Sequence, residues 1–117
     1  MDVNAVANTL ERSGNYVRLR RLTGRGLYIE VRCAARVTKF TPEMRALIGE
    51  AGGIAQGDRL CTISNREITD KQWPGPPRRG DLVIIEREGN TAMVQGSDTS
   101  DLMGVIVRHD MVIRGGS

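Results

Sequence analysis

The sequence predicts a mainly β fold, a small barrel of about six or seven antiparallel strands with a short N-terminal helix and one helix-containing insertion. Three observations lead to this prediction. The 117 residues include 14 glycines and only 3 % aromatic residues, a composition that suits a turn-rich β fold better than a helical bundle. Short stretches of alternating apolar and polar residues recur between glycine-containing turns. So many strands in one short chain leave exposed edges unless the sheet closes, so we expect residues 1–117 to form a single barrel domain.

A short helix is predicted at the start of the chain, before the first strand. Val3, Val6, Ala7 and Leu10 lie on one face of a helix over residues 2–12. A helix of about eleven residues is marginal on its own, so we expect it to dock on other parts of the protein.

The clearest strand pair covers residues 16–22 and 27–33, joined by a turn at 23–26. Within the second strand, Leu27, Ile29, Val31 and Cys33 share one face. Further strands are predicted at residues 59–64, 82–86 and 91–95, and residues 105–113 are predicted to form one closing strand or a pair of strands. Polar turns or loops are expected between them at 65–67, 88–90 and 96–101, and residues 114–117 are expected to form a flexible tail.

Residues 36–56 interrupt the strand pattern and are predicted to form an insertion with a short helix at 42–50. Thr41 is placed to cap that helix and Pro42 fits its first position. Gly52 and Gly53 are expected to end it. A long insertion in a small barrel is more often functional than incidental.

The charge pattern leaves two classes of partner open. The net charge is +3 and the pI is near 9.3, and all 17 basic residues except Lys39 and Lys71 are arginine. Arginine pairs well with carboxylates and phosphates, which fits either contacts between subunits or an anionic partner. No long apolar run or apolar leader is present, so we expect neither a membrane span nor a secretory signal. Cys33 and Cys61 are expected to be buried free thiols.

Catalytic chemistry is not expected, and neither is a metal or a cofactor. The single histidine, His109, is interpreted as an exposed strand residue, and Glu86 and Glu88 as solvated carboxylates beside a hairpin turn. The tripeptide Arg79-Gly80-Asp81 matches a cell-attachment motif, but its Gly-Asp pair is expected to form a turn before a strand, as does Gly57-Asp58. Known nucleotide, nucleophile-elbow and zinc motifs are absent from the sequence.

Direct nucleic-acid binding by a small basic barrel is the alternative function. Arginines crowd the first two strands, and Arg78 and Arg79 follow a proline-rich loop, so these side chains would be able to follow a phosphate backbone. Only Tyr28 is placed to stack on a base, however, and Glu30 beside it would repel phosphate.

The order of these parts resembles the head–tail stopper, or head-completion, proteins of long-tailed bacteriophages. A short helix precedes the strand at 16–21, and a second strand leads into a long insertion. The chain returns through residues 57–60, and the strand after residue 79 leads to a hairpin and a final strand. The resemblance covers nearly the whole chain as an order of elements and includes no catalytic signature.

The resemblance implies a non-enzymatic structural protein of the virion neck, made in the cytoplasm of the bacterial host. Such proteins form a ring, six- or twelve-fold, below the portal or adaptor and above the tail-tube or tail-terminator protein. The ring would help to retain packaged double-stranded DNA in its channel and would provide the surface to which the tail attaches. A tail-tube or tail-terminator subunit is a more distant alternative, since it shares the barrel and the ring.

The resemblance also points to candidate sites. The insertion of the family projects toward the channel and gates it, and the corresponding candidates for a gate or an inter-subunit loop are Phe40, Pro42, Met44, Leu47, Ile48, Gly49, Gly52 and Gly53. Helix 42–50 would either pack between subunits or close one end of its own barrel. Candidate interface residues are Trp73, Arg18, Arg20, Arg32, Arg78 and Arg79. Packing of Trp73 over its own barrel is the alternative for that side chain.

Overall fold

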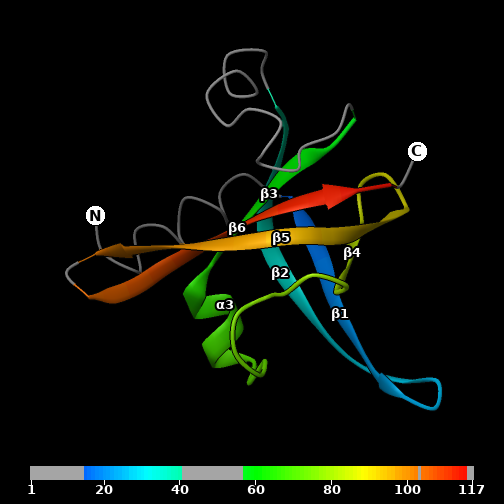
Figure 1. Cartoon of the computed structure of the whole chain (residues 1–117), viewed down its shortest axis with the longest axis horizontal. Helices are drawn as coiled ribbons and strands as arrows, with labels where there is room; N and C mark the ends of the chain where they lie inside the picture. The colour runs from blue at the N-terminus through cyan, green and yellow to red at the C-terminus, as the bar shows by residue number, and fades with distance from the viewer. Residues whose placement is uncertain (1–14, 41–56, 103, 116–117) are drawn as a thin grey trace.

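A closed antiparallel barrel of six strands forms the body of the protein, as predicted. The computed structural model describes residues 15–40, 57–102 and 104–115 (Figure 1). The strands follow one another around the barrel in the order β1-β2-β3-β6-β5-β4, and β4 pairs with β1 to close it. Their bounds are β1 Tyr16–Gly24, β2 Leu27–Lys39, β3 Arg59–Ser64, β4 Leu82–Ile85, β5 Asn90–Leu102 and β6 Val105–Arg114. Within these described ranges the helix is α3, which covers Asn65–Asp70.

The first hairpin forms where the sequence predicts it. β1 and β2 pair from Tyr16 opposite Ala34 to Gly24 opposite Leu27. The turn between them places Arg25 at a φ of 51° between two glycines with positive φ. The glycines adopt this left-handed conformation without strain, whereas Arg25 is held there by the tight turn.

β2 is longer than predicted because it changes partner halfway along. It pairs with β1 up to Ala34 and then with β3 from Ala35 to Lys39. The first four residues assigned to the insertion, 36–39, are therefore strand. The predicted helices at 2–12 and 42–50, and most of the predicted insertion, lie outside the described residues.

The polar turn predicted at 65–67 is wrong, because these residues begin α3. The helix has only six residues, too few to show a helical period in the sequence. Its Ile68 is buried, and the helix contacts β2, β3 and β6. Tertiary packing therefore stabilises a helix that the local sequence does not predict.

The loop predicted at 96–101 is also wrong, because β5 continues through it to Leu102. β5 pairs first with β4 and then, from Met93 onward, with β6. The polar composition that indicated a loop fits a hairpin that extends into solvent. At the other end of the chain, Arg114 belongs to β6 rather than to the predicted tail, and 116–117 lie outside the described residues.

Apolar side chains from alternate strand positions fill most of the barrel interior, and Ile68 of α3 and Trp73 of the loop after it add to the core. This alternation follows from the two-residue period of a strand. The core consists of Val17, Leu19, Cys33, Ala35, Cys61, Ile63, Ile68, Trp73, Val83, Ile85, Ala92, Val94, Met111 and Ile113. Cys33 and Cys61 are free and buried, as predicted, and burial raises the pKa of each thiol to about 12.

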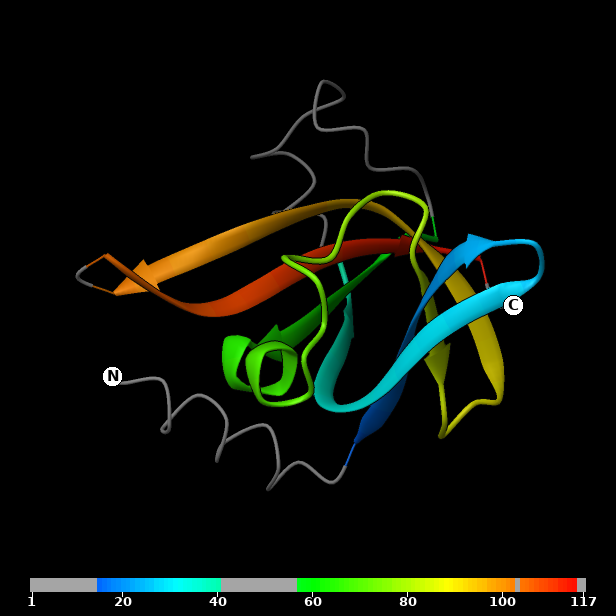
Figure 2. The ribbon, with the colours of Figure 1, turned by 90° about the horizontal axis from the view of Figure 1, so that it is seen from below.

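Two hairpins extend beyond the barrel on opposite sides. Figures 1 and 2 both show the β1–β2 turn on one side and the far end of the β5–β6 hairpin on the other. These two projections are the most exposed regular structure among the described residues.

Candidate functional site

A cluster of arginines surrounds one carboxylate where β1, β2 and β4 meet. Glu86 follows directly after β4 and accepts hydrogen bonds from Arg32, 2.8 Å away, and from Arg18, 3.4 Å away. The Arg32 guanidinium stacks 3.9 Å from the centre of the Tyr16 ring. Hydrogen bonding from Arg32 lowers the pKa of Glu86, and the same bond raises the pKa of Arg32.

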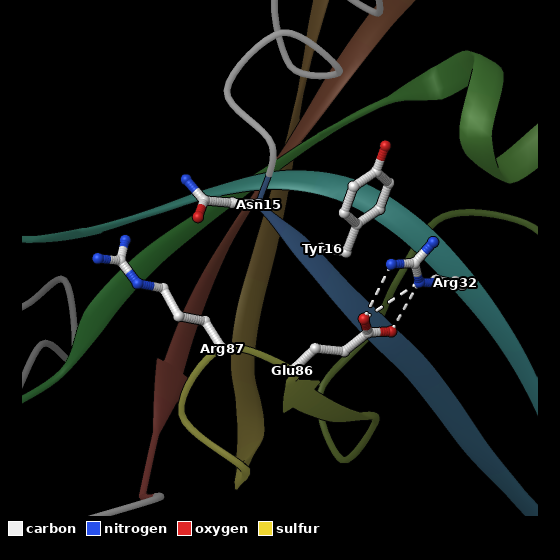
Figure 3. Close-up of a pocket in the computed structure, with 5 residues that line it drawn as sticks. All are labelled: Asn15, Tyr16, Arg32, Glu86 and Arg87. Atoms are coloured by element: carbon white, nitrogen blue, oxygen red, sulfur yellow. Dashed lines mark hydrogen bonds and ion pairs between the residues drawn. The ribbon is translucent and has the colours of Figure 1, made fainter.

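An open pocket of about 410 Å³ lies beside this cluster, lined by Asn15, Tyr16, Arg32, Glu86 and Arg87. In Figure 3, Arg32 and Glu86 point toward each other, whereas Arg87 extends away from them. The carboxylate is thus held ionised by two guanidinium groups of its own chain. An incoming phosphate or carboxylate would have to displace Glu86 before it bound these arginines.

The strand arginines predicted as interface residues pair within their own chain. Arg18 and Arg32 bind Glu86, and Arg20 binds Glu30 at 2.9 Å while its guanidinium stacks on Tyr28. The prediction that Glu86 and Glu88 are merely solvated is wrong, because Glu88 binds Arg59. Cross-strand pairing joins charges that lie far apart in the sequence, which a single strand pattern does not reveal.

Trp73 packs over its own barrel, which is the alternative that the sequence leaves open. Its side chain is buried, and the Arg21 guanidinium lies 4.8 Å from the ring centre. Arg21 also donates hydrogen bonds to the carbonyl oxygens of Pro74 and Pro76. Arg21 therefore holds the proline-rich loop against the barrel through hydrogen bonds. The buried Trp73 side chain is not exposed for contact with another protein.

The turn predicted at Gly80-Asp81 is confirmed. Gly80 has a φ of 96°, and Asp81 is buried in a bidentate pair with Arg21, with both distances 2.8 Å. Gly57 and Asp58 repeat this arrangement at the start of β3, where Asp58 binds Arg114. The aspartate of Arg79-Gly80-Asp81 faces its own barrel, so the tripeptide is not presented for attachment.

The side chains of Arg78 and Arg79 are exposed after the proline-rich loop. Phe40, half-buried just after β2, is the only gate candidate among the described residues. The other gate candidates, Pro42, Met44, Leu47, Ile48, Gly49, Gly52 and Gly53, lie outside them.

The prediction that His109 is exposed is wrong, because it lies on the inward face of β6 below α3. The side chain is 1 % exposed, and its Nε2 lies 2.8 Å from Oδ1 of Asn65. Its Nδ1 has no hydrogen-bond partner within the described part of the chain. Burial lowers the pKa of His109, and the nearby Asp110 only partly offsets this effect.

Acidification is expected to destabilise the protein through His109. The folded pKa lies below the ordinary value of 6.5, so the unfolded chain binds the proton first. The stability from neutral His109 is fully present above about pH 6.5 and is lost as the pH falls toward the folded pKa. Urea unfolding between about pH 7.5 and about pH 5, where carboxylates titrate little, would measure this loss. His109→Gln should flatten the pH dependence, and an unchanged slope in that variant would contradict the assignment.

Sequence reasoning missed two exposed apolar hairpin ends. The β1–β2 end comprises Leu22, Arg25, Leu27 and Tyr28, and its three apolar side chains are 63 %, 67 % and 50 % exposed. The β5–β6 end comprises Asp98, Val105 and Ile106, the last two 54 % and 38 % exposed. The alternation in the sequence assigns Leu27 to the core face correctly, but that face has no barrel below it at the hairpin tip.

Comparison of the chain with protein-family models, curated proteins and solved structures finds no significant match. Among residues 15–40, 57–102 and 104–115, no group of three His, Cys, Asp or Glu side chains is placed to hold a metal ion. Within the same residues, no helix has the length and apolarity needed to span a bilayer.

Proposed function

We propose that the protein is a structural subunit of a tailed-phage neck, which forms a ring between the portal or adaptor and the tail. In this role it would help to retain packaged DNA and provide the surface to which the tail attaches. The observation that carries the proposal is the pair of exposed hairpin ends on opposite sides of one closed barrel. A subunit of a ring needs two different surfaces, one for each neighbour.

The order of elements supports the same function. The segment between β2 and β3, adjacent strands of the barrel, is where the stopper family carries its insertion. The charges support it over direct nucleic-acid binding, because Arg18, Arg20 and Arg32 bind carboxylates of their own chain. A barrel that bound a phosphate backbone along these strands would need those guanidinium groups free.

Phage particles assembled without this protein are expected to contain DNA-filled heads that leak their genome and carry no tails. Adding the purified chain to such heads and to separate tails should restore joined, infectious particles. Electron micrographs and a count of infectious particles would measure both effects. Full, stable heads joined to tails in the absence of the protein would rule out the neck function. Tight binding of the isolated chain to DNA, with a steep decrease in affinity as salt rises, would favour the nucleic-acid alternative.

A further inference from the structure

We propose that neighbouring copies bind head to tail, with the β1–β2 end of one copy against the β5–β6 end of the next. This inference rests on the proposed ring and names the surfaces that would build it. The partner at each end is therefore a second copy of this chain.

Both ends expose large apolar side chains that the barrel does not cover. Leu22 and Tyr28 lie directly opposite each other on one face of the first hairpin, where the Arg20 guanidinium stacks on the Tyr28 ring, and Leu27 lies on the other face. Val105 and Ile106 begin the return strand of the second hairpin. Single exposed apolar residues are common on protein surfaces, but two projecting tips that each expose apolar side chains on both faces suit contact with a partner.

Among the described side chains, each end has one charge without an ion pair, and these two charges are opposite. Arg25 projects from the β1–β2 turn, and no ion pair joins it to the described residues. Asp98 lies directly opposite Asp110 on the neighbouring strand, and its carboxylate accepts a hydrogen bond from the backbone N–H of Thr99. Asp110 pairs with Arg108 of its own chain, 3.4 Å away, and accepts a hydrogen bond from the Thr62 hydroxyl. No ion pair joins Asp98 to the described residues, so its carboxylate is open to a guanidinium from another copy.

The positions of the ends determine the kind of contact. They lie on opposite sides of the barrel in both views, so one copy offers a different end to each neighbour (Figures 1 and 2). A two-fold dimer through either end alone would place like charges together. Pairing unlike ends joins opposite charges, and such head-to-tail contacts close into a ring when the rotation between neighbouring copies permits it.

Charge reversal tests this contact in purified protein. Arg25→Glu alone and Asp98→Arg alone should each raise the concentration needed for assembly by roughly tenfold or more, because every contact then joins like charges. An equal mixture of the two variants should assemble like the wild type, since every contact between unlike variants joins opposite charges. Sedimentation velocity and electron microscopy would measure assembly.

A matched control and a thiol experiment complete the test. Lys39→Glu makes the same charge change at the exposed last residue of β2, at the strand end remote from both hairpin tips, and it should assemble normally. If the wild-type chain is monomeric in solution, the contact is tested by mixing the Leu27→Cys and Ile106→Cys proteins and oxidising the mixture. They should form a disulfide-linked heterodimer, while each alone stays mostly monomeric, and the buried Cys33 and Cys61 should not compete.

Two results would contradict the proposed contact without contradicting the proposed ring function. The first is assembly of both single variants at wild-type concentration, and the second is absence of the heterodimer. The ring function itself is decided separately, by the particles assembled without the protein.

Discussion

Replacing Arg21 with alanine is expected to lower the free energy of unfolding by about 3–5 kcal/mol, because it leaves the buried carboxylate of Asp81 without its partner. Arg21 is 8 % exposed and Asp81 is 2 % exposed, so water does not compensate the lost charge. The substitution also removes the hydrogen bonds to Pro74 and Pro76 and the contact with Trp73. Chemical denaturation at neutral pH would measure the change.

Arg20 is the matched control for this prediction. It is the adjacent residue on the same strand and faces the opposite side of the sheet, where it pairs with Glu30 in a partly exposed site. Because exposed ion pairs contribute little, Arg20→Ala should cost no more than about 1 kcal/mol. Equal losses for Arg20→Ala and Arg21→Ala would show that burial of the Arg21–Asp81 pair does not govern its contribution.

Replacing Leu19 with alanine is expected to destabilise the protein by about 2–5 kcal/mol, through loss of buried apolar surface and creation of a cavity. Leu19 is fully buried at the centre of β1, which pairs with β2 on one side and β4 on the other. Closure of the barrel limits how far the surrounding strands can move to fill the space. Thermal and urea unfolding would measure the loss.

Leu22→Ala gives the comparison within the same strand. Leu22 is 63 % exposed at the hairpin tip, so its truncation should change the stability of the monomer by less than about 0.5 kcal/mol. A loss at Leu22 as large as that at Leu19 would mean that the tip is covered in the free chain. In that event the β1–β2 end would no longer qualify as a contact surface.

The sequence predicts the strands well where one face is buried and the other is solvated. The alternation in β1 and the first half of β2 is clear because the barrel interior selects apolar residues at every second position. The glycines at 57, 80 and 89 mark turns because each needs a positive φ. Closure follows from the number of strands rather than from any one motif.

Other features depend on contacts between distant segments, which a pattern along the chain does not contain. α3 is too short to show a period, and the far half of β5 is polar because it pairs with β6 outside the barrel. The sequence gives His109 the pattern of an exposed strand residue, whereas in the fold α3 packs against β6 and His109 is buried. Among the candidate sites, the arginines of β1 and β2 pair with carboxylates of the same chain, and their role at an interface stays a prediction.

Closure of the barrel also sets the order in which the fold can form during synthesis. The β1–β2 hairpin is local, whereas Arg21 and Asp81 are 60 positions apart and β1 cannot pair with β4 until that whole stretch has left the ribosome. β3 must wait still longer for β6, the last strand. Non-local pairings of this kind fold slowly, typically in milliseconds to seconds. Until Asp81 emerges, the nascent chain therefore carries an arginine that has no carboxylate to pair with. Until β6 emerges, two strand edges of the unfinished barrel stay open to other chains.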